Sequence, residues 1–338
     1  MQPDFTQILK VLRHEKPDRP TLFEFYLNGR LNTRLAGPYP QNPTRLESHA
    51  FTAKCFFAAG YDYVTLMGSN GLCFPANRAA SKQTKSLNDG AIITDRASFD
   101  AYPWPDPDAI DYSSYGDALT PALRGAKIMP ALPGGPLENV INLTGYDNLC
   151  FMLADDPVLV TDIFEAVCSR LLRFVEIVAP MPNVGILMLN DDWGFRSQTM
   201  LGLADMRKYV FPWHKAMVAT AHKHGKPAVL HSCGNADEIM GDIIRDMKYD
   251  AKHSFEDAIE PIETAYEKYG RDIALLGGID VDFMVKSTPD AIRERARKLL
   301  KLSEKHNNFA LGTGNSVPEY IPDENYLAMT SVALEGRK

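Results

Sequence analysis

The chain has 338 residues, of which 45% are hydrophobic and 23% are charged, as is ordinary for a globular protein with a sizeable core. Its formal net charge is −7 and it has no basic run, which argues against nucleic acid and against an anionic membrane as partners. No apolar stretch reaches the roughly 18 residues that a membrane-spanning helix needs.

The cysteines are an odd number and are scattered along the chain, which is not the pattern of a disulfide framework. They lie at Cys55, Cys73, Cys150, Cys168 and Cys233. Reduced thiols are typical of the cytoplasm, and the first residues show no basic segment followed by an apolar run, as an export signal would. We therefore expect a cytoplasmic protein.

The first third of the chain alternates helical and strand patterns. A helix, a strand, a second helix and a second strand are predicted at residues 5–14, 20–26, 42–59 and 61–67. Residues 68–118 are rich in Gly, Asn, Pro and Ser, and so long a segment after the second strand indicates an elaborated functional loop.

The remainder continues the alternation. Further strands are predicted at 127–132, 184–189, 228–230, 250–255, 273–276 and 309–311. Helices are predicted at 137–153, 157–179, 203–224, 236–247, 260–269, 289–305 and 323–335. Eight buried-looking strands that alternate with helices predict parallel α/β units, and eight strands close a single (β/α)8 TIM barrel over residues 1–338. An open doubly wound sheet is the alternative, but no GxGxxG pattern follows the first strand.

The strand at 228–230 leads directly into His231-Ser232-Cys233-Gly234. Side chains in a strand repeat with a period of two, so His231 and Cys233 project to the same side. An imidazole and a thiol placed together can hold one soft divalent metal ion. The alternative is that Cys233 packs as a small hydrophobic residue and His231 is satisfied by a hydrogen bond.

Other polar side chains follow the remaining strands. In chain order they are Glu24, Tyr26, Asp191, Asp192, Gln198, His253, Glu256, Asp280, Thr313 and Asn315. The carboxyl ends of barrel strands share one mouth, so this convergence indicates an enzyme. The adjacent carboxylates Asp191 and Asp192 favour a catalytic role, because they repel each other unless paired. Asp280 serves equally well as a helix cap, and Trp193 more often belongs to a core than to a substrate platform.

Four motifs in this order carry a family resemblance. They are Asp191-Asp192-Trp193-Gly194 with Gln198, His231-Ser232-Cys233-Gly234, Gly277-Gly278-Ile279-Asp280, and Gly312-Thr313-Gly314-Asn315 with Pro318 and Pro322. With them the chain resembles the uroporphyrinogen decarboxylase superfamily, and within it the corrinoid-dependent methyltransferases. The resemblance runs through most of the chain and is strongest over residues 184–325. It implies a barrel mouth that receives a tetrapyrrole, or a corrinoid carried by a partner protein.

The methyltransferase branch implies zinc held by the His-x-Cys pair, here His231 and Cys233. Where the thiol-methylating members have a third ligand cysteine this chain has Thr313, and Glu256 or an aspartate is the expected replacement. Fewer thiolates leave the metal more electrophilic, which favours activation of a methyl donor such as an ether or amine. On this interpretation Asp191, Asp192 and Glu24 are catalytic, while Tyr26, Trp193, Gln198, Asp280 and Asn315 bind the small-molecule donor or acceptor.

Two alternatives remain beside corrinoid-dependent methyl transfer. The first is metal-free decarboxylation of uroporphyrinogen, for which Arg30 and Arg34 resemble the family's substrate-binding arginines. Against it, the fuller arginine motif is missing, position 24 is an acid, and residues 67–70 offer no carboxylate after the second strand. The second is a non-catalytic tetrapyrrole-binding protein. The oligomeric state is left open, with a homodimer among the expectations.

Overall fold

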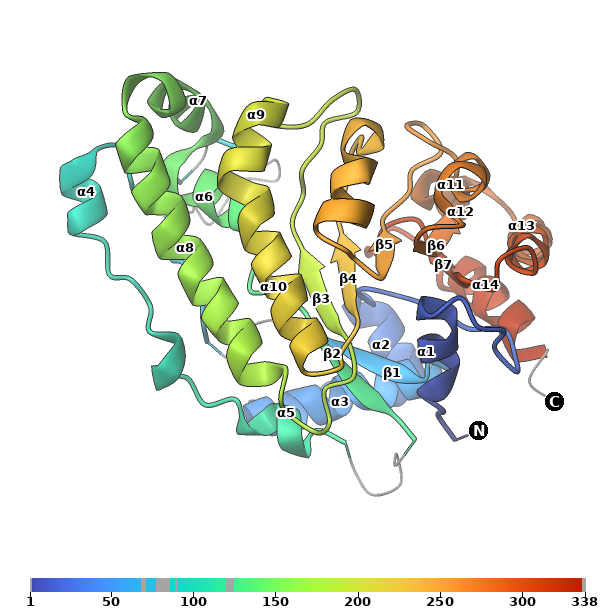
Figure 1. Cartoon of the computed structure of the whole chain (residues 1–338). Helices are drawn as coiled ribbons and strands as arrows, with labels where there is room; N and C mark the ends of the chain where they lie inside the picture. Colours follow the sequence, from blue (N-terminus) through green and yellow to red (C-terminus); the bar gives the residue numbers. More distant parts are fainter. Residues whose placement is uncertain (1, 68–70, 77–85, 89, 120–124, 336–338) are drawn as a thin grey trace.

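The computed structural model describes residues 2–67, 71–76, 86–88, 90–119 and 125–335. In this part of the chain seven strands lie inside a layer of helices, and each ladder between neighbouring strands is parallel (Figure 1). The strands are β1 (Tyr63–Leu66), β2 (Lys127–Pro130), β3 (Leu187–Asn190), β4 (Ala228–His231), β5 (Ala251–His253), β6 (Ala274–Ile279) and β7 (Phe309–Thr313). Nearly every strand residue is buried, which explains why their sequences are continuous apolar runs.

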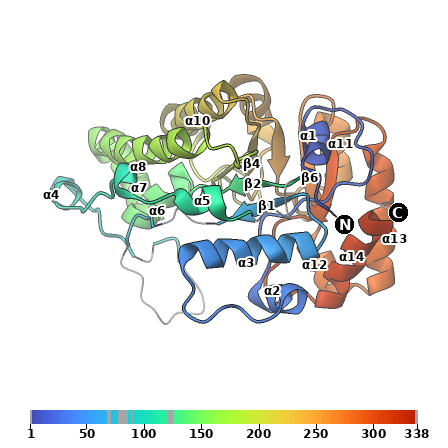
Figure 2. The same cartoon turned by 90° about the horizontal axis from the view of Figure 1, so that it is seen from below.

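Helices connect successive strands and cover the outside of the sheets (Figures 1 and 2). They are α1 (Thr6–Leu12), α2 (Gly29–Ala36), α3 (Arg45–Ala58), α4 (Arg96–Asp100), α5 (Ser113–Asp117), α6 (Pro136–Thr144), α7 (Tyr146–Asp155), α8 (Pro157–Val178), α9 (Leu203–Asp205), α10 (Phe211–Lys223), α11 (Ile262–Tyr269), α12 (Val281–Lys286), α13 (Pro289–Ser303) and α14 (Asp323–Glu335). Short 3₁₀ helices are η1 (Pro107–Ala109) and η4 (Asp237–Ile239), and π-helical segments are η3 (Met206–Val210) and η5 (Asp242–Asp246).

Most predicted helices are present, and the exceptions have local causes. The helix predicted over 137–153 is divided into α6 and α7, because Gly145 has a left-handed φ of +76° at the junction. The helix predicted over 236–247 is present as one irregular helical segment over residues 237–246, which begins with the 3₁₀ helix η4 and ends with the π-helix η5. Helix α2 was not predicted, although Asn28 caps it by accepting a hydrogen bond from the Leu31 amide.

The strands form a five-stranded sheet, β3-β4-β5-β6-β7, and a separate pair, β1-β2. Single parallel bridges, Ile128 to Val184 and Ala131 to Met188, link β2 to the region of β3. The predicted α/β class with parallel strands is thus confirmed, whereas hydrogen bonds between the described residues do not close an eight-stranded barrel. That residues 1–338 form one domain stays a prediction.

The first predicted strand, residues 20–26, is not a regular strand, and this part of the prediction is wrong. The segment touches β7 through the single bridge Leu22 to Leu311. On the side that faces β1, hydrogen bonds with side chains take the place of backbone pairing between strands. The Tyr63 hydroxyl accepts from the Glu24 amide at 2.7 Å, and the Thr65 hydroxyl donates to the Glu24 carbonyl at 3.0 Å. The Glu24 amide and carbonyl therefore have hydrogen-bond partners on this side without strand pairing.

The long segment predicted after the second strand is built of α4, η1 and α5 where the structure describes it. Residues 68–70, which belong to the segment predicted to offer no carboxylate, lie outside the described residues, as do 77–85 and 89. Among the described helices, none combines the length and the apolar character needed to cross a membrane.

Candidate metal centre

The register of three neighbouring strands brings the candidate ligands to one place. Asn190 of β3 pairs with His231 of β4, and His231 pairs with His253 of β5. The three strands therefore end at the same level, and the residues just beyond them share the carboxyl edge of the sheet. The loops after β3 and β4 approach closely there, since a Cβ on Gly234 would lie 2.0 Å from the Gly194 carbonyl oxygen. This contact explains the glycine in each loop.

Asp192, His231 and Cys233 form a group whose potential metal ligand atoms all lie within 4.8 Å of one another. The His231 Nε2 atom lies 3.7 Å from the Cys233 Sγ atom. Two ligands on a tetrahedral zinc ion, with bonds of about 2.0–2.1 Å to nitrogen and about 2.3 Å to sulfur, are separated by roughly 3.6 Å. The donor set of one nitrogen, one sulfur and one oxygen therefore fits a divalent ion such as zinc.

Two hydrogen-bond donors face the Cys233 sulfur atom. The Asn315 side-chain amide donates to Sγ at 3.1 Å, and the Ser254 hydroxyl lies 3.9 Å from it. The Cys233 amide donates to Asp192 Oδ1 at 2.8 Å, which ties the carboxylate to the same loop. Burial, and next the Asp192 charge, raise the pKa of the thiol, so binding a cation would have to displace the thiol proton.

The His231 imidazole is held on both sides. Its ring stacks on Phe25 with centroids 4.3 Å apart, and its Nδ1 atom lies 2.8 Å from Nδ1 of His253. Burial lowers the pKa of His231 well below its ordinary range and lowers that of His253 to about 3. Both imidazoles are therefore neutral, which is the form that ligates metals.

Asp191 is fully buried and its hydrogen bonds are all to neighbouring protein groups. It accepts from the Leu137 and Glu138 amides at the start of α6, from the Trp193 indole at 2.7 Å, and it lies 3.0 Å from His214 Nε2. Trp193 is equally buried, 1% exposed, and packs on Phe211 and His214. In this geometry Asp191 positions neighbouring groups and Trp193 belongs to the core, while their predicted catalytic and substrate-binding roles stay predictions.

Glu24 is also fully buried. Its carboxylate accepts from the Thr313 hydroxyl at 2.9 Å and from the Thr313 amide at 3.2 Å. Burial raises the pKa of Glu24 to about 8, although these hydrogen bonds oppose the shift. A carboxyl that keeps its proton near neutral pH can act as an acid, so the predicted catalytic role stays a prediction.

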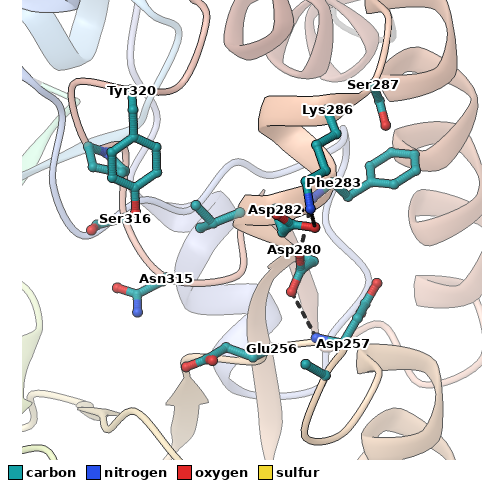
Figure 3. Close-up of a pocket in the computed structure, with 13 residues that line it drawn as sticks. Glu256, Asp257, Asp280, Asp282, Phe283, Lys286, Ser287, Asn315, Ser316 and Tyr320 are labelled. Carbon is teal, nitrogen blue, oxygen red and sulfur yellow. Dashed lines mark hydrogen bonds and ion pairs between the residues drawn. The ribbon is translucent and has the colours of Figure 1, made fainter.

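A cavity of about 650 Å³ opens beside the metal centre. Its lining includes Glu256, Asp280 and Asn315, and Figure 3 shows Asn315 and Tyr320 along one side and Asp280 and Phe283 along the other. Asp280 also caps α12 by accepting from the Phe283 amide, and it accepts from the Asp257 amide at 2.9 Å. Burial, followed by the charges of Asp280 and Asp192, raises the pKa of Glu256. The cavity thus joins predicted substrate-binding residues to the sulfur ligand through Asn315.

The remaining predicted residues lie elsewhere or take other positions. Glu256, the expected third ligand, is not in the group with His231 and Cys233, where Asp192 stands instead. Tyr26 lines a different cavity of about 450 Å³, together with Arg45 and His49. Gln198 is exposed on the loop after β3, where its backbone carbonyl accepts from the Phe195 amide.

Two ionisable side chains near the centre were not predicted. Lys252, 3% exposed, donates to the Ser254 carbonyl at 2.7 Å and lies over the Phe255 ring, and burial lowers its pKa to about 8. Glu138 accepts from the Gly135 amide, and burial, then the Asp191 and Asp192 charges, raise its pKa to about 8. For Lys252 the sequence signal is a lysine within a segment predicted to be a buried strand; for Glu138 the sequence gives no such signal.

The chain matches the family model described as uroporphyrinogen decarboxylase (URO-D) over residues 94–335. A solved structure named "methyltransferase from Methanosarcina mazei" is similar with a TM-score of 0.72 at 15% identity, covering 98% of each chain. A Paenibacillus barcinonensis xylanase, XynB, is similar with a TM-score of only 0.42 at 12% identity, over 81% of this chain and 90% of that one. No curated protein matches the sequence.

Proposed function

Because the chain belongs to the uroporphyrinogen decarboxylase family, we propose that it is a methyltransferase of that family. It would move a methyl group between a small-molecule donor or acceptor and a corrinoid carried by a partner protein. The observation that supports this most is the group of Asp192, His231 and Cys233, which suits a zinc ion. The likeness in fold to a methyltransferase from Methanosarcina mazei agrees with it.

The chain's own residues would prepare both the metal and the substrate. When bound, zinc would supply a Lewis acid for the heteroatom that carries the methyl group, and the corrinoid would supply the cobalt that exchanges it. Asn315 and Ser254 stabilise the Cys233 sulfur as a thiolate by hydrogen bonding. Glu256, whose raised pKa favours a bound proton, faces the same cavity and could protonate the departing heteroatom.

The ligand set and the cavity favour a neutral or cationic methyl donor. A site with one thiolate is more electrophilic than one with two, and the cavity beside it carries Glu256, Asp257, Asp280 and Asp282 against Lys286. Carboxylates there would repel a polyanion. An ether or an amine therefore fits better than a substrate with many acidic groups.

Uroporphyrinogen decarboxylation is the second candidate, favoured by the description of the matching family model. The arginines that would bind the substrate's acid groups are used differently. Arg30 donates to Asp323 at 3.0 Å, and Arg34 pairs with Glu324 at 2.8 Å, so both hold α2 against α14. This pairing weakens the decarboxylase reading.

The test is methyl transfer from simple ethers and amines to reduced free cobalamin, followed by the visible spectrum of the cobalamin. The zinc-loaded protein should transfer the methyl group, Cys233→Ser should lose the activity, and Cys150→Ser, which changes an exposed cysteine, should keep it. Decarboxylation of uroporphyrinogen that needs no metal and survives Cys233→Ser would contradict the proposal. Binding of a tetrapyrrole without turnover of either kind would identify a binding protein instead.

All five cysteines are free, as expected of a protein with reduced thiols, and we place the reaction in the cytoplasm. The corrinoid protein would dock over the carboxyl edge of the strands, where the metal centre and the cavity lie.

A further inference from the structure

A line of hydrogen bonds runs from Thr313 through two buried imidazoles to the metal centre. His253 Nε2 lies 3.2 Å from the Thr313 carbonyl oxygen, and His253 Nδ1 lies 2.8 Å from His231 Nδ1. The far nitrogen of His231, Nε2, faces Cys233 Sγ at 3.7 Å. Each ring nitrogen along this line thus has one identified neighbour.

The chemistry of these neighbours fixes where the protons are. A carbonyl oxygen can only accept, so His253 Nε2 carries a hydrogen. His253 is fully buried and forms no ion pair with a carboxylate among the described residues, so it is neutral and its Nδ1 carries none. His231 Nδ1 must then donate to His253, which leaves the lone pair of His231 Nε2 directed at the sulfur ligand.

We propose that His253 is a positioning residue that sets the tautomer of His231 and so presents its Nε2 atom to the metal. Metal-ligating histidines usually donate their second ring N–H to a fixed acceptor, and here that acceptor is another imidazole. The inference rests on the proposed metal site, but the tautomer itself exists without any metal.

Two features hold His253 in this arrangement. A Cβ on Gly277 would lie 2.2 Å from the Thr313 carbonyl oxygen and 2.9 Å from His253 Nε2, so only glycine lets these groups meet. The other end of Thr313 is anchored, since its hydroxyl donates to the buried Glu24 carboxylate at 2.9 Å. Thr313 thus serves the site through its carbonyl, although it stands where a ligand cysteine was expected.

Two variants of His253 separate the positioning role from a general effect on folding. His253→Phe keeps a flat ring against Phe23, whose centroid lies 5.0 Å away, but offers no acceptor. His253→Asn places a carbonyl oxygen near the position of Nδ1 and keeps the acceptor. His49→Phe, which changes a buried histidine lining the other cavity, controls for the loss of a buried imidazole.

The first readout is the ¹⁵N NMR spectrum of histidine-labelled, metal-free protein. His231 should carry its proton on Nδ1 in the unmodified protein, in His253→Asn and in His49→Phe, and should shift toward the Nε2-protonated form in His253→Phe. The second is titration with Co²⁺, whose dissociation constant should rise by about 10- to 100-fold in His253→Phe and less in His253→Asn.

An Nε2-protonated His231 in the unmodified metal-free protein, or an unchanged tautomer in His253→Phe, would overturn the inference. An unmodified protein with the expected tautomer that binds no Co²⁺ would instead refute the proposed metal site. The two failures are therefore distinguishable.

Discussion

At the scale of single residues, the centre depends on side chains whose charge is controlled by burial. His231 is kept neutral, the Cys233 thiol is kept protonated until a cation displaces its proton, and Asp192 has a raised pKa, mainly through burial. Without a cation these groups avoid buried charge by staying neutral, and a divalent ion would compensate for the charge that appears when the thiol and the carboxyl lose their protons. The same residues would therefore bind metal tightly and stabilise the folded protein when loaded.

The identity of the third ligand can be tested by neutralising each candidate. Asp192→Asn should weaken zinc binding by at least about 100-fold, because it removes a charged ligand oxygen from the group. Glu256→Gln should change zinc affinity by less than about tenfold, since Glu256 lies outside that group. Competition with a chromophoric chelator measures both. If Glu256→Gln weakens zinc binding more than Asp192→Asn does, Glu256 and not Asp192 is the third ligand.

Glu24 predicts a specific dependence of stability on pH. Its pKa is about 8 in the folded protein against an ordinary value of 4.5, so between these values the folded state holds a proton that the unfolded state has lost. Stability from this group therefore falls as pH rises from about 4.5 to 8. Relative to the unmodified protein, Glu24→Gln should gain about 3 to 4 kcal/mol of unfolding free energy between pH 5 and pH 8, as urea titrations would show. A difference in unfolding free energy between the two proteins that stays constant from pH 5 to pH 8 would contradict this.

At the scale of secondary structure, the end of β3 is attached to the start of α6 through Asp191. The carboxylate accepts from two α6 amides and from the Trp193 indole, and a Cβ on Gly135 would lie 2.1 Å from its Oδ1. Gly135 thus leaves the space that the carboxylate occupies. Asp191 fixes the backbone from which the neighbouring candidate ligand Asp192 projects.

Asp191→Ala should lower the unfolding free energy by about 3 kcal/mol or more, because it leaves several buried donors without a partner. Asp290→Ala, in the first turn of α13 and highly exposed, should change it by less than about 0.5 kcal/mol. Chemical denaturation compares the two. An Asp191→Ala protein as stable as the control would show that Asp191 is free for the catalytic role that its sequence position suggested.

Local sequence predicted the metal pair but not its complete surroundings. The period of two along β4 was enough to place His231 and Cys233 together. β4 has a neighbour on each side, and an acid follows each of them: Asp192 after β3 and Glu256 after β5. Which of the two supplies the third ligand depends on loop geometry between strands. For the same reason the sequence does not show that the Tyr63 and Thr65 hydroxyls bind the Glu24 backbone in place of a neighbouring strand. The apolar pattern of residues 20–26 therefore predicts a strand that is not formed.

At the scale of the whole molecule, the last described helix, α14, packs against the first part of the chain (Figures 1 and 2). The Tyr61 and Tyr326 hydroxyls form a fully buried hydrogen bond of 2.8 Å between the segment before β1 and α14. The pairs of Arg30 and Arg34 with α14 are more exposed and add less. The buried tyrosine pair is therefore the stronger link between the ends.

A double-mutant cycle tests this link. Tyr61→Phe and Tyr326→Phe should each lower the unfolding free energy by about 1 to 2 kcal/mol, since each leaves one buried hydroxyl without its partner. The double variant should lose less than the sum, because no hydroxyl is then left unsatisfied. Additive losses would show that the two hydroxyls do not depend on each other.

The most direct test of the central claim is the zinc content of the purified protein, measured by inductively coupled plasma mass spectrometry after reconstitution and desalting. We expect about one zinc ion per chain in the unmodified protein and in Cys150→Ser, and almost none in His231→Ala or Cys233→Ser. Zinc that stays bound after either ligand is removed, or an unmodified protein that retains none, would contradict a metal centre at the ends of β3 and β4.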